Sequence, residues 1–168
     1  MLPEHVIQKI QLEMKKYPSR RSALVGALHA AQQEYGYLSP EVVGEVAGLF
    51  DFDPNALNEL VTFYSMLYRE PVGKYVLGVC DSLTCYLVGS DRTIDYLSQL
   101  LEVSVGGTTP DGLFTLQRAE CLAACEAGPV MLVNDIHHEN LIYHGNLTPE
   151  RLEAIVQDLR SQAAKDNA

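Results

Sequence analysis

The first seventy residues or so show apolar positions that recur with the period of an α-helix. Apolar residues three or four positions apart lie on one face of a helix, and such stripes repeat along this part of the chain. Two of the segments begin at Ser39-Pro40 and Asp53-Pro54, where a capping side chain precedes a proline at the first helical position. Gly36 follows an earlier segment, and glycine commonly ends a helix. The pattern predicts a small bundle of helices. Its stripes are Val6, Ile7, Ile10 and Met14; Leu24, Ala27, Leu28 and Ala31; Val42, Val46 and Leu49; and Leu57, Leu60, Val61 and Tyr64.

The pattern changes after Pro71-Val72-Gly73, where short runs of β-branched, aromatic and other apolar residues begin. We expect an α/β fold, with an N-terminal helical region over residues 1–70 and a small sheet covered by helices over residues 71–168. The expected elements are a strand over Tyr75–Val79, a helix over about Tyr86–Leu101, strands over Leu113–Ala119 and Val130–Val133, a short strand near Leu141–Tyr143, and a last helix after Thr148-Pro149.

The charge balance narrows the range of partners. The chain has 12 Lys and Arg against 22 Asp and Glu, a net charge of −10. A strongly acidic chain lacks the cationic surface that nucleic acids and anionic membranes attract. No apolar run approaches the roughly 20 residues that span a bilayer, and the N-terminus has no signal-peptide pattern. We therefore expect a cytoplasmic protein that makes no direct membrane contact and reaches the inner face of a membrane only through a partner.

Four cysteines stand out in the second half of the chain: Cys80, Cys85, Cys121 and Cys125. They fall as C-x4-C, then 35 intervening residues, then C-x3-C. Each pair comes directly after a predicted strand. Because loops that leave the same edge of a sheet lie close together, we expect the two pairs to meet.

The residue type and spacing narrow the chemistry of this group. A reducing compartment disfavours disulfides, and four thiolates are soft donors that favour zinc or an iron–sulfur cluster. Structural zinc sites usually have C-x2-C spacing, whereas C-x4-C is the first step of plant-type ferredoxin spacing. The spacing favours an iron–sulfur cluster and leaves zinc or unliganded thiols as alternatives. The sequence has no C-x-x-C redox motif, no G-x-G-x-x-G and no Walker A pattern, so we expect neither disulfide reductase activity nor binding of NADH or FMN by this chain alone.

Three blocks of sequence extend this pattern: Thr62–Met66 with Pro71–Tyr75, Cys80–Gly89, and Thr109–Asp135. With the helical N-terminus, they resemble the thioredoxin-like [2Fe–2S] ferredoxin subunit of respiratory complex I, the NADH-quinone oxidoreductase. The resemblance implies a thioredoxin-like C-terminal domain in which all four cysteines bind one [2Fe–2S] cluster. It also implies a partner, a flavoprotein subunit that binds FMN, NADH and a [4Fe–4S] cluster, and no catalytic residue on this chain.

The resemblance predicts an electron-transfer subunit of an NADH-oxidising complex, with complex I as the first choice. The same module serves NAD-linked hydrogenases and formate dehydrogenases as a diaphorase subunit, and a zinc-stabilised, non-redox adaptor is a further alternative. The N-terminal helices carry no chemistry of their own, so we expect them to dock on the partner. One departure concerns Ala123, where the family usually has glycine. If that position needs a positive φ, alanine is strained there by about 1 kcal/mol.

Overall fold

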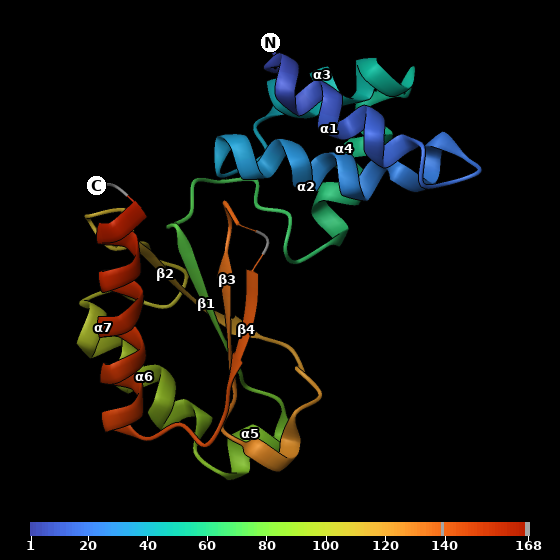
Figure 1. The fold of residues 1–168 in the computed structure, drawn as a ribbon. Coiled ribbons are helices and arrows are strands. Elements are labelled where there is room, and N and C mark those ends of the chain that lie inside the picture. Colours follow the sequence, from blue (N-terminus) through green and yellow to red (C-terminus); the bar gives the residue numbers. More distant parts are fainter. Residues whose placement is uncertain (139, 167–168) are drawn as a thin grey trace. The chain divides into compact units, whose positions relative to one another are not determined.

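The computed structural model describes residues 1–138 and 140–166. The chain forms two compact units, Met1–Pro71 and Val72–Ala168 (Figure 1). The division into two domains stays a prediction, because compactness does not establish that either unit folds independently. No helix among the described residues is long and apolar enough to cross a membrane.

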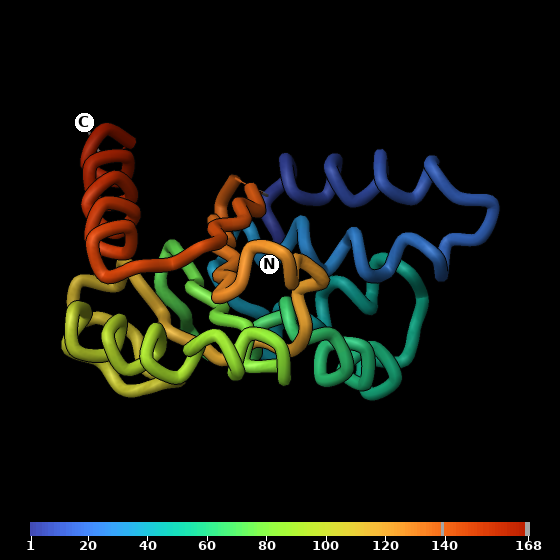
Figure 2. Tube along the Cα trace, turned by 90° about the horizontal axis from the view of Figure 1, so that it is seen from below, coloured from blue at the N-terminus to red at the C-terminus, as the bar shows by residue number. Residues whose placement is uncertain are grey.

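The first unit is helical, as the periodicity predicted. Its helices are α1 (Glu4–Met14), α2 (Leu24–Tyr35), α3 (Pro40–Phe50) and α4 (Pro54–Phe63), with a 3₁₀ turn over Arg20–Ala23. The predicted start signals are present, because Ser39 Oγ accepts a hydrogen bond from the Val42 amide at 3.3 Å and Asp53 Oδ1 accepts one from the Asn55 amide at 2.9 Å. Gly36 ends α2 in the left-handed conformation, with φ 78°. Figures 1 and 2 show α1 and α2 side by side.

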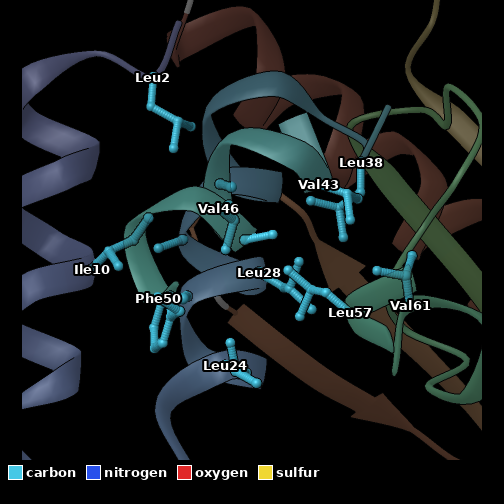
Figure 3. Packing of buried hydrophobic residues seen from close by; sticks show 14 of the residues in the cluster. Leu2, Ile10, Leu24, Leu28, Leu38, Val43, Val46, Phe50, Leu57 and Val61 are labelled. Atoms are coloured by element: carbon cyan, nitrogen blue, oxygen red, sulfur yellow. The ribbon is translucent and has the colours of Figure 1, made fainter. Parts of the chain in front are cut away.

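The apolar stripes of these helices converge on one core, which is shown in Figure 3. One predicted core position is wrong: Tyr64 is 41% exposed and makes an edge-on contact with Phe63, with ring centroids 5.1 Å apart. The reason is that α4 ends at Phe63, and Tyr64 is already extended, so the helical period no longer applies to it. Buried members of the core include Val6, Ile10, Leu24, Leu28, Val43, Val46, Leu57 and Val61.

The segment that follows α4 is fixed by a buried glutamine. Gln32 of α2 is 3% exposed, and its amide group bonds to two backbone groups of this segment. Its Nε2 donates to the Met66 carbonyl at 2.9 Å, and its Oε1 accepts from the Tyr68 amide at 2.7 Å. Buried backbone groups need such partners, so Gln32 takes the place of secondary structure there.

The second unit is built on a four-stranded sheet in the order β2-β1-β3-β4 (Figure 1). The central strand β1 is parallel to β2 and antiparallel to β3, and β3 and β4 form an antiparallel pair. A parallel pair needs a crossover connection, which here contains two helices. The strands are β1 (Tyr75–Cys80), β2 (Phe114–Ala119), β3 (Met131–Asp135) and β4 (Asn140–His144), close to their predicted positions.

Three helices accompany this sheet: α5 (Leu83–Leu87), α6 (Ser90–Leu101) and α7 (Pro149–Asp166). The single helix expected over residues 86–101 is wrong, because Gly89 has φ 102° and separates α5 from α6. Figure 1 shows α6 and α7 on the same side of the sheet. They bury one core against it, with Leu77, Val79, Ile94, Leu97, Leu116, Met131, Val133, Leu152 and Leu159 among its members.

Candidate metal centre

Both cysteine pairs lie where the parallel strands β1 and β2 end. Cys80 is the last residue of β1, and in the sheet register it lies opposite Ala119, the last residue of β2. The Asp81 amide donates to the Ala119 carbonyl at 3.1 Å, and the Cys80 amide donates to the Val130 carbonyl at 3.0 Å. The carboxyl ends of parallel strands share one edge of a sheet, and this register is why cysteines far apart in sequence approach each other.

The first cysteine pair is buried. Cys80 and Cys85 are each 2% exposed and form a small apolar cluster with Val130. Cys85 lies on α5, so one turn of helix carries the second thiol back toward the end of β1. Leu122, Ala124 and Ala127 of the second cysteine loop pack against the same cluster. The two cysteine segments are therefore in contact through their apolar side chains.

Hydrogen bonds to sulfur give the two buried thiols different acidities. Burial opposes ionisation of Cys80, but amide donors from Leu122 and Ser82, with the side chains of Cys85 and Ser82, outweigh it and lower its pKa below the ordinary value. Burial and the hydrogen bond with Cys80 raise the pKa of Cys85, although the Val130 amide acts in the opposite direction. The surroundings of Cys80 therefore favour its thiolate, and those of Cys85 oppose it.

The second pair is exposed and lies on a short, sharply turned loop. Cys121 and Cys125 are both exposed, and a 3₁₀ turn begins at Cys125. Between them, Ala123 has φ 55°, the left-handed conformation that alanine adopts at a cost of about 1 kcal/mol. Ala123 therefore has the positive φ for which strain was expected from the sequence. Cys125 lies near enough to Cys85 to act on its ionisation.

An ion-paired arginine that the sequence did not single out holds the first cysteine loop. Arg118 Nη1 lies 3.0 Å from Asp81, the residue after Cys80, and 3.0 Å from Asp91 in the first turn of α6. These carboxylates keep the pKa of the Arg118 guanidinium above its ordinary value. The β1–β2 register places Arg118 near Asp81, and α6, which packs against β2, brings Asp91 to it. No local sequence signal predicts this arrangement.

The second cysteine loop is supported by close backbone packing. A Cβ added to Gly145 would lie 2.5 Å from Ala127 Cβ, and the Asn146 amide donates to the Ala127 carbonyl. A Cβ added to Gly128 would lie 2.9 Å from Val88 Cγ2 and 3.8 Å from Cys85 Sγ. Only glycine, which has no Cβ, allows approaches as close as these. The Gly145-Asn146 pair was a turn signal in the sequence that the prediction of the site did not use.

The end of the unit that carries the cysteines also exposes apolar side chains. All four belong to α5 or directly follow it: Leu83 is 74% exposed, Tyr86 56%, Leu87 74% and Val88 53%. Figure 1 shows α5 beside the 121–129 loop. A concentration of large apolar side chains on one short helix is unusual for a surface that faces only water.

The donor set suits a thiolate-bound cluster. All four cysteines are free, and backbone amides of Leu122, Ser82 and Val130 donate to the buried sulfurs. Amide donors stabilise thiolates and are typical of iron–sulfur ligands. Within residues 1–138 and 140–166, no three His, Cys, Asp or Glu side chains form a group around a single position suited to a metal ion.

Comparison with known proteins identifies the family. The family model of the thioredoxin-like [2Fe–2S] ferredoxins matches residues 10–160. This chain belongs to the thioredoxin-like [2Fe–2S] ferredoxins. The family accounts for the fold of both units and makes one [2Fe–2S] cluster the expected cofactor, as predicted from the sequence.

Relatives of this ferredoxin are subunits of NADH-quinone oxidoreductases. The chain is 42% identical over 154 residues to the NADH-quinone oxidoreductase E 2 subunit of Rhizobium meliloti, covering 92% of this chain and 88% of the relative. It is 40% identical over 148 residues to NADH-quinone oxidoreductase subunit 2 of Thermus thermophilus, covering 87% of this chain and 79% of that one.

A solved structure shares the ferredoxin fold. The crystal structure of an NAD⁺-reducing [NiFe]-hydrogenase in the air-oxidised state superposes with a TM-score of 0.69 over 83% of this chain, at 19% sequence identity. The chain spans 23% of the length of that hydrogenase chain. At this level of identity the likeness concerns the fold alone.

Proposed function

We propose that this chain is the electron-transfer subunit of an NADH:quinone oxidoreductase, with one [2Fe–2S] cluster bound by Cys80, Cys85, Cys121 and Cys125. The observation that carries the proposal is the approach of the two cysteine pairs at the ends of β1 and β2, with backbone amides donating to the buried sulfurs. Identity of 42% to an NADH-quinone oxidoreductase subunit over nearly the whole chain supports the choice of host complex.

The cysteines have unequal roles in this proposal. Cys80 and Cys85 form the rigid half of the site, because they are buried and held by β1, α5 and the Val130 backbone. Cys121 and Cys125 form the exposed half, on a loop three residues long between the two thiols. When bound, the cluster supplies one-electron transfer. The protein fixes the thiolates, hydrogen-bonds to their sulfurs and keeps water from one side of the site.

The proposed partner is the flavoprotein subunit that binds FMN, NADH and a [4Fe–4S] cluster. Hydride transfer from NADH belongs to that subunit, and this chain contributes no catalytic side chain. The exposed apolar side chains of α5 support docking at the end of the unit that carries the cysteines. A partner seated there brings its redox group close to the thiolates and removes apolar surface from water.

The first experiment measures iron, acid-labile sulfide and zinc in anaerobically purified protein, together with an EPR spectrum after dithionite reduction. We expect about two irons and two sulfides per chain and an S = 1/2 signal, the composition of the four-thiolate two-iron cluster. One zinc per chain without an EPR signal, and failure of reconstitution with iron and sulfide, would establish the zinc adaptor instead.

The ligand assignment is tested separately. Each single Cys→Ser variant at positions 80, 85, 121 and 125 is expected to lose most of its iron or to show an altered EPR spectrum, because a serine oxygen is a harder donor than a thiolate. Thr84→Ala, at an exposed position of the first cysteine loop, is the matched control and is expected to keep full iron content. Full iron and an unchanged spectrum in any Cys→Ser variant would remove that residue from the ligand set.

The host complex is tested by co-purification. The chain is expected to purify with a flavoprotein of the NADH:quinone oxidoreductase when both are expressed in the cells that make the complex. Recovery with a hydrogenase or formate dehydrogenase diaphorase instead would change the host and leave the cluster assignment intact.

A further inference from the structure

We infer that Ala123 is a positioning residue whose left-handed backbone turn holds both halves of the second cysteine loop against the first pair and thereby sets the reduction potential of the cluster. This inference rests on the proposed function, because it concerns the cluster assigned to the four cysteines. It assigns a role to a residue that bears no ligand atom.

The half of the loop before Ala123 is anchored to the first cysteine pair. The Leu122 amide donates to the sulfur of Cys80, and the Leu122 side chain packs on the buried cluster of Cys80, Cys85 and Val130. Cys121 is therefore held by its neighbour, although its own side chain is exposed. This anchor fixes the direction in which the chain enters Ala123.

The half of the loop after Ala123 has its own anchors. The Ala127 amide donates to the Ala124 carbonyl at 3.1 Å, and the Asn146 amide donates to the Ala127 carbonyl. Ala124 and Ala127 also pack on the buried cysteine cluster. These contacts fix where Cys125 lies, which is near Cys85.

Only one residue has the freedom to join these two fixed halves. Three residues separate Cys121 from Cys125. Leu122 and Ala124 are both packed against the buried cysteine cluster, and Ala124 has a negative φ of −121°. Ala123 is exposed and carries the positive φ of 55°. A negative φ at this position would rotate one half away from its anchors, so that either the Leu122 amide leaves Cys80 or Cys125 moves away from Cys85.

The reduction potential reports on this turn. An amide that donates to a cluster sulfur stabilises the more negative, reduced state, so loss of that donor lowers the reduction potential. The methyl group of Ala123 faces solvent and is not part of the buried cluster. Replacements of Ala123 that are similar in size but differ in their tolerance of positive φ therefore separate the effect of backbone conformation from the effect of side-chain bulk. If the potential changes only with the residue that disfavours positive φ, the backbone conformation is the cause.

The test compares three variants of the full chain with the native protein: Ala123→Gly, Ala123→Asn and Ala123→Val. Glycine and asparagine tolerate the left-handed conformation, whereas the β-branched valine, which is similar in size to asparagine, does not. The measurements are iron and sulfide content, an EPR-monitored redox titration, and the rate of iron loss to a chelator. We expect Gly and Asn variants to match the native potential, and the Val variant to have a lower potential and to lose iron about tenfold faster, the factor to which 1.4 kcal/mol corresponds.

Each outcome decides the inference. A lower potential or complete loss of the cluster in Ala123→Val, with native behaviour in Ala123→Asn, supports the role of the turn. Equal potentials and equal rates in all four proteins overturn it, and so does an equal fall in the Asn and Val variants, because added bulk would then be the cause. Absence of iron and sulfide from the native protein would instead refute the proposed function.

Discussion

Among single residues, Gln32 is expected to contribute strongly to stability through its two hydrogen bonds to the backbone. Replacement by Ala leaves the part-buried Met66 carbonyl and the buried Tyr68 amide without their partner, so we expect Gln32→Ala to lower the free energy of unfolding by about 2–3 kcal/mol. Urea unfolding at neutral pH measures this change. The control is Gln8→Ala on the exposed face of α1, with an expected change below about 0.5 kcal/mol. Equal losses in the two variants would contradict the buried role of Gln32.

A pH dependence is expected from Asp111. Its pKa is lowered from an ordinary value of 3.8, first by a hydrogen bond from Thr109 and further by the Leu113 amide and Arg160. A lowered carboxyl pKa gives stability that is present above the unfolded pKa and is lost as the pH falls through the folded pKa. Because the Asp111 side chain is 46% exposed, we expect Asp111→Asn to cost no more than about 1 kcal/mol at pH 7. Urea unfolding at pH 7 and pH 3 should show the native–variant difference shrinking at the lower pH, and a constant difference would disprove the linkage.

Sequence reasoning singled out residues by their chemistry and missed those whose role depends on register. The four cysteines were identifiable because thiols at C-x4-C and C-x3-C spacing have few other uses in a reducing compartment. Ala123 was singled out because glycine is usual there, and its φ of 55° agrees with that reasoning. Arg118 was missed because Asp81 and Asp91 approach it only once β1 and β2 are paired.

At the level of secondary-structure elements, the surroundings of Gly73 and Gly44 predict opposite effects of substitution by alanine on stability. A Cβ on Gly73, just before β1, would lie 2.7 Å from the Phe114 carbonyl carbon, whereas a Cβ on Gly44 in α3 would meet nothing within 4 Å. We expect Gly73→Ala to destabilise the protein by about 1–3 kcal/mol and Gly44→Ala to stabilise it by about 0.5–1 kcal/mol. Thermal and urea unfolding measure both, and the two variants serve as controls for each other. A stabilising Gly73→Ala would show that β1 and β2 can separate without cost.

Helix α5 is expected to be a contact element rather than a core element. Leu83 and Leu87 are each 74% exposed, so the double variant Leu83→Ser/Leu87→Ser is expected to keep the fold and the iron content. Its affinity for the flavoprotein should fall at least about tenfold, because each buried leucine contributes roughly 1.5–3 kcal/mol to an interface. Binding of the purified subunits at equilibrium is the measurement. Leu141→Ser, at a 46% exposed position on β4, is the control. Unchanged affinity in the double variant would exclude α5 from the interface. The N-terminal helices, which the sequence analysis expected to dock on the partner, would then be the candidate surface.

The elements themselves were largely predictable from local signals. Proline after Ser39 and after Asp53 fixed the starts of α3 and α4, and the period of apolar residues gave their buried faces. The break between α5 and α6 was missed, because helical periodicity continues across Gly89 although its φ of 102° interrupts the helix. Periodicity indicates which residues face the core, but it does not show where the backbone breaks between two consecutive helices.

At the scale of the whole molecule, we propose that the two compact units are separate domains. Each has its own buried apolar cluster, and Val72–Ala168 contains all four cysteines. A fragment that begins at Val72 is expected to unfold in one cooperative transition and to take up iron and sulfide at the stoichiometry of the full chain. Calorimetry and metal analysis test this, with Cys80→Ser in the same fragment as the control. A fragment without a cooperative transition would show that the helical unit is required for folding.

The position of β1 at the centre of the sheet has a consequence for the order of events during synthesis. Both of its neighbours, β2 and β3, come later in the chain, so the strand has no complete set of partners until Asp135 has left the ribosome. The helical unit is complete before β1 begins and is free to fold first, since domains commonly fold in the order of their translation. Until β2 and β3 arrive, Cys80 and Cys85 are unprotected thiols on a nascent chain. Cluster insertion therefore belongs to the last stage of biogenesis, and a ribosome-bound chain that stops before residue 135 should accept no iron.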